Sequence, residues 1–165
     1  MDHNIQAYVN AFEEGKSLRT ICQEFQISDL VLIQALAHKP EITLLGKDYV
    51  KPLLAQLPSI GTVMTITEHL GSVFEFKGSF PSGTEGHGYH NLNLHGDGFG
   101  GHININNISH IAVVTETMKN NRQSLSWWFI HETGQVVFKV FVGRDADGEL
   151  KHEQVTILNQ WHQKK

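Results

Sequence analysis

Potential metal ligands and glycines are concentrated in residues 83–102, GTEGHGYHNLNLHGDGFGGH. These twenty residues contain one tyrosine, Tyr89, seven glycines and four histidines: His87, His90, His95 and His102. Imidazole and phenolate are good ligands for iron and other transition metals. Glycine lets the backbone turn sharply or approach a flat ligand closely. The segment is therefore the first candidate for a metal or cofactor site.

A β-hairpin across residues 89–108 would organise these side chains into two faces. Pairing Leu94 with Ile103, and Leu92 with Ile105, puts four aliphatic side chains on one face. The other face is then polar.

The polar face of this hairpin would carry Tyr89, His95 and His102. His95 is expected opposite His102, with the Cβ atoms about 5 Å apart. Tyr89 lies six residues from His95, about 20 Å along a strand. We therefore expect that Tyr89 and His102 of one flat hairpin cannot reach the same metal ion unless a bulge or a second subunit brings them together.

The same side chains also have ordinary structural roles. Histidines in glycine-rich turns are commonly exposed, which is the expectation for His87 and His90. His95 and His102 also suit an exposed cross-strand pair, and Tyr89 suits a core aromatic. A structural zinc site is not indicated, because the segment has no thiolate ligands. The residues alone predict no more than a candidate metal or cofactor site.

Length and composition limit the class of protein in which this site can occur. A chain of 165 residues with 40% hydrophobic residues fits one domain with a real core. Its net charge of −4 gives no general attraction to nucleic acid or to an anionic membrane. The single cysteine, Cys22, cannot form an internal disulfide. No signal peptide is visible, and no apolar stretch approaches the roughly 20 residues that span a bilayer. The expectation is a soluble cytoplasmic protein.

The first fifty-odd residues are expected to be helical. Ile5, Tyr8 and Phe12 fall on one face of a first helix. Ser17 and Ser28 can cap a second and a third helix. A short fourth helix is expected within residues 48–57, with a proline in its first turn.

After residue 61 the hydrophobic pattern changes from helical to alternating. Strands are expected at 62–68, 72–77, 89–95, 102–108, 110–116, 124–131 and 135–142. Residues 149–162 return to a helical pattern. This order predicts an α+β fold with N-terminal helices, an antiparallel sheet of about seven strands and a closing C-terminal helix. We expect one domain over residues 1–165, with a helical part at 1–58 and the sheet and closing helix at 60–165.

Several short motifs resemble the HutX/ChuX family of cytoplasmic heme-utilisation carriers. The matching stretches are PSG at 81–83, HGYHN at 87–91, GGHI at 100–103, SHIAVV at 109–114 and GQVVFKVFVGRD at 134–145. Such proteins are similar in fold to one half of the larger bacterial heme-transport and heme-degradation proteins. The resemblance implies a homodimer that binds heme b, limits its toxicity and passes it to a heme-degrading acceptor protein.

The resemblance also implies ligands for the heme iron. Tyr89 matches the tyrosine of the HGY motif, and His102 matches the histidine of the GHI motif. Some family members use a histidine early in the strand region, where this chain has Glu68 with His69 beside it. A phenolate is a hard anionic ligand for ferric iron, and a neutral imidazole suits ferric or ferrous heme. We treat Tyr89 and His102 as alternative ligands, with His69 as a third candidate.

Other residues could contact the rest of a heme molecule. Lys139 and Arg144 are candidate partners for the two propionates, although a turn-stabilising pair with Asp145 or Asp147 is the favoured role for Arg144. Phe99 could pack against the macrocycle. Trp127 and Trp128 are adjacent on a strand and point to opposite faces, so core packing is the expectation for both.

Two other function classes compete with a carrier. SLRTICQEFQISDLVLIQAL at 17–36 has the outline of a helix-turn-helix, but its second helix offers Asp29 and no lysine or arginine for DNA. A heme-degrading enzyme would need an oxygen-binding pocket and an electron source. No flavin or nicotinamide fingerprint is visible, but an external reductase could supply electrons. The sequence leaves this second alternative open.

Overall fold

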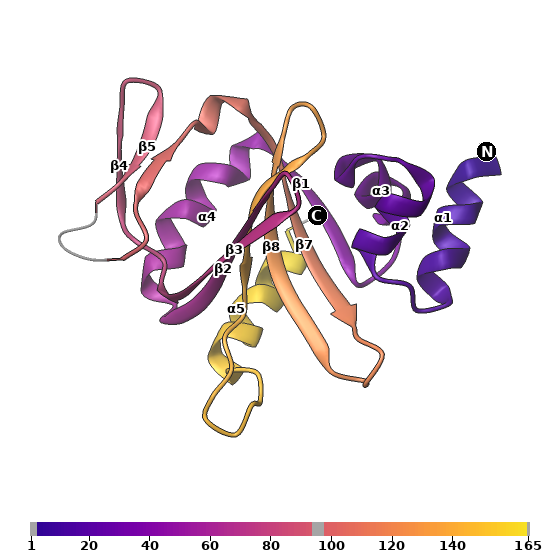
Figure 1. The fold of residues 1–165 in the computed structure, drawn as a ribbon. Coiled ribbons are helices and arrows are strands. Elements are labelled where there is room, and N and C mark those ends of the chain that lie inside the picture. Colours follow the sequence, from indigo (N-terminus) through magenta and orange to yellow (C-terminus); the bar gives the residue numbers. More distant parts are fainter. Residues whose placement is uncertain (1–2, 94–97, 165) are drawn as a thin grey trace.

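The computed structural model describes residues 3–93 and 98–164. Three N-terminal helices, α1 (His3–Glu13), α2 (Leu18–Phe25) and α3 (Asp29–Leu36), pack together at one end of the molecule (Figure 1). The two expected N-caps are confirmed: Ser17 Oγ accepts a hydrogen bond from Thr20 N, and Ser28 Oγ accepts one from Val31 N. Two further helices, α4 (Val50–Gln56) and α5 (His152–His162), follow where the sequence predicts them.

Nine strands in the described ranges form two antiparallel sheets. The larger sheet has the order β1-β7-β8-β9-β2-β3 and the smaller one β4-β5-β6. Their bounds are β1 Ile42–Gly46, β2 Thr62–His69, β3 Ser72–Ser79, β4 Gly83–Gly86, β5 Tyr89–Leu92, β6 Gly101–Ile103, β7 Ile108–Thr117, β8 Gln123–His131 and β9 Val136–Phe141. Short 3₁₀ helices lie at Lys47–Tyr49, Leu57–Ser59 and Ile105–Asn107.

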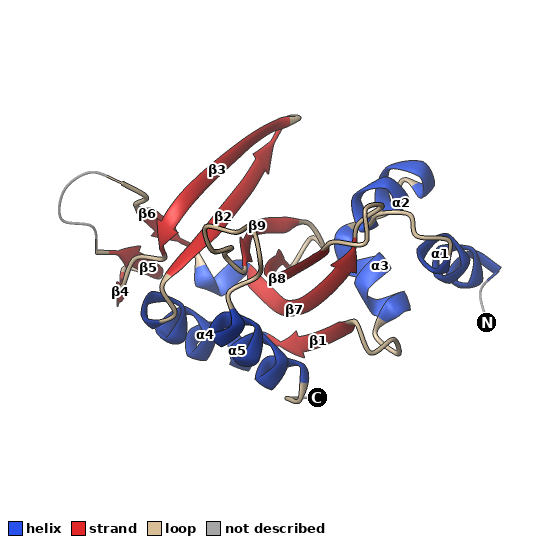
Figure 2. Cartoon of the chain, turned by 90° about the horizontal axis from the view of Figure 1, so that it is seen from below, coloured by secondary structure: helices blue, strands red, loops and turns tan. Residues whose placement is uncertain are grey.

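The large sheet separates two hydrophobic cores. Helices α4 and α5 cover one face, as Figure 2 shows, and α1–α3 cover part of the other. Trp127 and Trp128 are both buried, the first in the α4–α5 core and the second in the α1–α3 core. The expectation of core packing for both tryptophans is therefore confirmed. In both views the small sheet and the three N-terminal helices lie at opposite ends of the molecule (Figures 1 and 2).

The predicted α+β class is confirmed, but three strands differ from the expectation. Strand β1 lies within residues 1–58, which were expected to be helical, and pairs along β7. Strand β4 was not predicted, because GTEG at 83–86 has no apolar alternation. The strand expected at 102–108 ends at Ile103 and gives way to a 3₁₀ turn. No helix in the described ranges is long and apolar enough to span a bilayer.

Candidate functional site

The register of the small sheet differs from the predicted hairpin. Asn91 pairs with His102, and Leu92 pairs with Gly101. The pairing of His102 with His95 is therefore wrong by four residues, and His95 itself lies outside the described residues. A shift by an even number of residues keeps each side chain on its expected face, because side chains alternate with a period of two.

The new register brings Tyr89 and His102 together on the same face of the sheet. Their ring centroids lie 6.2 Å apart in an edge-to-face arrangement. The expectation that Tyr89 and His102 lie too far apart to reach one metal ion is therefore wrong. Both side chains are exposed, so a large ligand can approach them from solvent. Tyr89 is not a core aromatic.

Asn91 connects His102 to the neighbouring strand. The Asn91 Oδ1 atom lies 2.6 Å from His102 Nδ1. Asn91 Nδ2 donates to the carbonyl oxygens of Thr84 and Gly86 on β4, each at 3.3 Å. The sequence pattern indicated a polar face here but gave no reason to single out this asparagine.

His90 occupies the opposite, inward face of β5. It was expected to be exposed, but only 9% of it is accessible, and the Nε2 atom has no hydrogen-bond partner among the described residues. Burial lowers the pKa of His90, and the nearby Glu85 carboxylate partly opposes that effect. The ring fits because residue 83 is glycine: a Cβ there would lie 2.1 Å from His90 Nε2. His87 is exposed, as expected.

Phe99 lies just before β6 and packs with two other aromatic rings. Its ring centroid is 5.5 Å from that of Phe76 on β3 and 5.9 Å from that of Phe80. Phe76 and Phe99 are only partly buried. Phe99 also packs against the α4–α5 core, so this aromatic cluster joins the segment before β6 to the large sheet.

His69 and Lys139 line a different cavity of about 680 Å³. It lies between α2–α3 and the part of the large sheet formed by β2, β3 and β9, and Cys22 and Asp29 also line it. The Lys139 Nζ atom lies 3.6 Å from the centroid of the Trp128 ring, and burial lowers the pKa of this amine. Because α2 and α3 stand at the far end from the small sheet, the structure does not bring these residues to Tyr89 and His102.

Arg144 has a local structural role in the turn after β9. It donates to the carbonyl oxygen of Gly148 at 2.9 Å and to that of Gln123 at 2.6 Å. The expected pairing with an adjacent aspartate is replaced by these carbonyl contacts. Arg144 does not line the cavity that contains Lys139, and its hydrogen bonds are with this turn and with β8.

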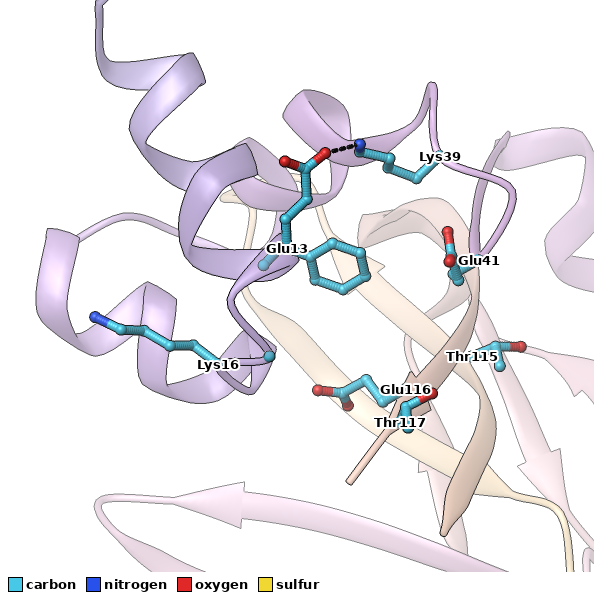
Figure 3. Close-up of a pocket in the computed structure, with 9 residues that line it drawn as sticks. Glu13, Lys16, Lys39, Glu41, Thr115, Glu116 and Thr117 are labelled. Carbon is cyan, nitrogen blue, oxygen red and sulfur yellow. Dashed lines mark hydrogen bonds and ion pairs between the residues drawn. The ribbon is translucent and has the colours of Figure 1, made fainter. Parts of the chain in front are cut away.

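A further cavity of about 310 Å³ contains none of the predicted site residues (Figure 3). Lys39 reaches across it to pair with Glu13, and Glu116 accepts a hydrogen bond from Leu18 N. The Glu41 Oε2 atom is buried there without a hydrogen-bond partner among the described residues. Within the described ranges, no group of three or more His, Cys, Asp and Glu side chains is arranged to hold a metal ion.

Comparisons with known proteins identify the family of this chain. Residues 43–163 match the family model described as haem utilisation ChuX/HutX. The chain is 32% identical, over 82% of its length and 69% of the relative's, to the intracellular heme transport protein HutX of Vibrio cholerae.

Solved structures give the same family and a wider fold relationship. The structure of the heme-binding protein ChuX is 26% identical and superposes with a TM-score of 0.85, covering 97% of each chain. The heme-degrading enzyme ChuS of Escherichia coli O157:H7 is 18% identical, with a TM-score of 0.75, over 95% of this chain but 46% of ChuS. The expected likeness to one half of a larger protein is thereby confirmed at the level of fold. The match to the family model covers most of the chain, and the chain therefore belongs to the ChuX/HutX family of haem-utilisation proteins.

Proposed function

We propose that this protein is an intracellular heme carrier, which binds heme b and delivers it to a heme-degrading acceptor protein. Family membership supports heme as the cargo, and the HutX relative carries the name of a transport protein. The observation that carries the proposal is the pair of possible iron ligands, Tyr89 and His102, side by side on an open face.

The chemistry of this face suits a heme that must later be released. Phenolate and imidazole are both axial ligands of heme iron. A single protein ligand on an exposed surface leaves the opposite coordination position to water or to a second protein. Phe99, which packs with Phe76 and against the core, is proposed to offer the exposed part of its ring to the macrocycle. Affinity then rests on one coordinate bond and limited burial, which favours transfer over permanent storage.

The cavity lined by His69 and Lys139 is the alternative place for the heme. An imidazole at its rim could bind iron, and the amine of Lys139 could meet a propionate. The Lys139 cation, however, already lies over Trp128. The lining also contains three carboxylates, those of Asp29, Glu68 and Glu75, and one further cation, Arg19, which pairs with Glu68. These negative charges disfavour the two propionates of heme. We therefore place the heme at Tyr89 and His102.

A hemin titration tests the carrier function directly. We expect saturable binding near one equivalent per chain, with a shifted Soret band. A titration without saturation would refute the carrier proposal. Incubating the complex with a reductant under oxygen then separates a carrier from an enzyme: intact heme supports the carrier, and biliverdin-like products support degradation.

We also propose that the protein forms a homodimer through strand β3. This strand lies at the edge of the large sheet, so one row of its backbone groups has no partner strand. Phe74 on β3 is 61% exposed, and Leu70 in the preceding turn is 92% exposed. Light scattering should give twice the chain mass for the native protein. A proline in place of Phe74 should give a monomer if the edge is the interface.

A further inference from the structure

We infer that Asn91 is a positioning residue, which fixes the His102 ring so that its Nε2 atom carries the free lone pair for iron. This inference rests on the proposed heme-carrier function, and it concerns a residue that the motif comparison left without a role. It follows from the hydrogen bonds around a single amide group.

The orientation of the Asn91 amide is fixed by strand β4. The Nδ2 group lies 3.3 Å from the carbonyl oxygens of both Thr84 and Gly86. A carbonyl oxygen only accepts hydrogen bonds, so the atom facing it must be the NH₂ group. The other amide atom, which faces His102, is therefore the oxygen.

The orientation of the amide in turn fixes the tautomer of His102. Asn91 Oδ1 lies 2.6 Å from His102 Nδ1 and can only accept, so Nδ1 must carry the proton. In a neutral imidazole the proton is then absent from Nε2, which keeps its lone pair. No described residue bonds to His102 Nε2. Hydrogen bonding of the second ring nitrogen is the usual way in which proteins orient a metal-binding histidine.

The arrangement also distinguishes His102 from Tyr89. No described residue accepts or donates a hydrogen bond at the Tyr89 hydroxyl, whereas the His102 ring is held through Asn91 to the backbone of β4. Holding a ligand in place before binding lowers the entropic cost of forming the bond. The geometry therefore points to His102 Nε2 as the iron ligand, with Tyr89 packed at the edge of its ring.

Three variants test the inference. Asn91→Leu removes the acceptor and both donors, and Asn91→Asp keeps an acceptor facing Nδ1 but removes the donors to β4. Asn93→Leu is the matched control, because Asn93 lies beside the same strand and bonds to Thr84 Oγ1 but not to His102. Circular dichroism establishes that each variant is folded.

The first readout uses the heme-free protein. Nitrogen and carbon chemical shifts of the His102 ring, measured at alkaline pH where free imidazole is neutral, report the tautomer. We expect the Nδ1–H form in the native protein, in Asn91→Asp and in Asn93→Leu. Asn91→Leu should populate the Nε2–H form. The Nε2–H form in the native protein or in Asn91→Asp, or an unchanged tautomer in Asn91→Leu, would overturn the inference.

The second readout is the rate at which hemin leaves the protein for an apomyoglobin scavenger. Asn91→Leu should release hemin about 10- to 100-fold faster, as expected for loss of a group that orients a metal ligand. Asn93→Leu and Asn91→Asp should not accelerate release. Unchanged release in Asn91→Leu contradicts the inference even if the tautomer changes.

Failure of the inference and failure of the proposed function can be told apart. If the native protein takes up no hemin, the carrier proposal and the role of Asn91 in iron binding fall together. If the native protein binds hemin but His102→Ala binds and releases it equally well, the carrier function stands and the inference about Asn91 is overturned.

Discussion

The ring centroids of Tyr89 and His102 lie 6.2 Å apart, with the ring planes at 74° to each other. The two side chains come from neighbouring strands, β5 and β6, which pair through their backbones and are bridged by the hydrogen bond between Asn91 and His102. A ligand that approaches one of these rings therefore meets the other. Each test of one residue as an iron ligand therefore includes a variant of the other.

We expect His102→Ala to change the Soret spectrum of the hemin complex more than Tyr89→Phe does. Loss of the imidazole removes the proposed iron ligand, whereas loss of the hydroxyl leaves the aromatic ring that packs at its edge. Absorption spectra of both variants, titrated with hemin under the same conditions, check this order. A larger change in Tyr89→Phe would make the phenolate the ligand, and no change in either would refute this face as the heme site.

Lys139→Met is expected to leave the affinity for hemin unchanged. Its amine lies in the cavity between α2–α3 and the large sheet, at the other end of the molecule from the small sheet. Methionine retains most of the volume and removes a buried charge, so stability should be unaffected or slightly higher. A clear loss of hemin affinity would instead move the heme to the cavity that contains His69, and His69→Ala would then show the same loss.

Gly83→Ala is expected to lower the free energy of unfolding by about 1–3 kcal/mol, which is typical of an overpacked core. The added Cβ would lie 2.1 Å from His90 Nε2, a distance that forces the ring to move. Urea denaturation gives the change. Gly46→Ala is the matched control, because a Cβ at residue 46 meets no atom within 4 Å.

The double variant Gly83→Ala/His90→Ala tests the cause of that destabilisation. If the imidazole is the obstacle, adding Gly83→Ala to the His90→Ala protein should cost much less than adding it to the native protein. Equal costs in the two backgrounds would show that the alanine acts through the backbone and not through His90.

The stability of the protein should fall as the pH drops below about 6.5, in part because of His90. Burial holds the pKa of His90 below its ordinary value, so the unfolded chain takes up a proton at a higher pH than the folded chain does. The contribution to stability is therefore fully present above the unfolded pKa and declines between the unfolded and the folded value. Denaturation series at several pH values should show a shallower decline in His90→Leu.

His87→Leu provides the comparison for this pH effect, because His87 is exposed. The fall in the free energy of unfolding with falling pH should be the same in His87→Leu as in the native protein. His110 also has a pKa lowered by burial, so some decline will remain in His90→Leu. An identical slope in the native protein and in His90→Leu would show that the His90 ring accepts its proton without cost.

The sequence predicted the elements better than it predicted their pairing. The N-caps Ser17 and Ser28 were predicted correctly because each depends only on a hydrogen bond to a backbone N–H three residues later in the chain. The hairpin register was wrong because apolar alternation fixes which face a side chain occupies but does not fix how far one strand slides along another. The expected pairing of Leu94 with Ile103 obeyed the alternation rule as well as the observed register does, so the rule could not distinguish the two.

The site shows the same limit. Tyr89 and His102 could be proposed as candidate ligands from the sequence, because their side-chain chemistry and the family motifs single them out. Asn91 was missed because its role depends on two carbonyl oxygens of β4, a strand that GTEG does not reveal. His90 was placed in solvent because the turn around it is rich in glycine, yet one of those glycines, Gly83, makes the room that buries it.

The contact between Gly83 and His90 also limits how this part of the chain can change during evolution. With the His90 ring placed as it is, a Cβ at residue 83 would lie 2.1 Å from Nε2, so a side chain at 83 requires the ring to move or residue 90 to become smaller. We expect the two positions to covary among relatives, with larger residues at 83 accompanied by smaller ones at 90. Paired changes at 83 and 90 would preserve the packing on the buried face of β5. Tyr89 and Asn91 lie on the outer face of the same strand, so they can vary independently of that packing.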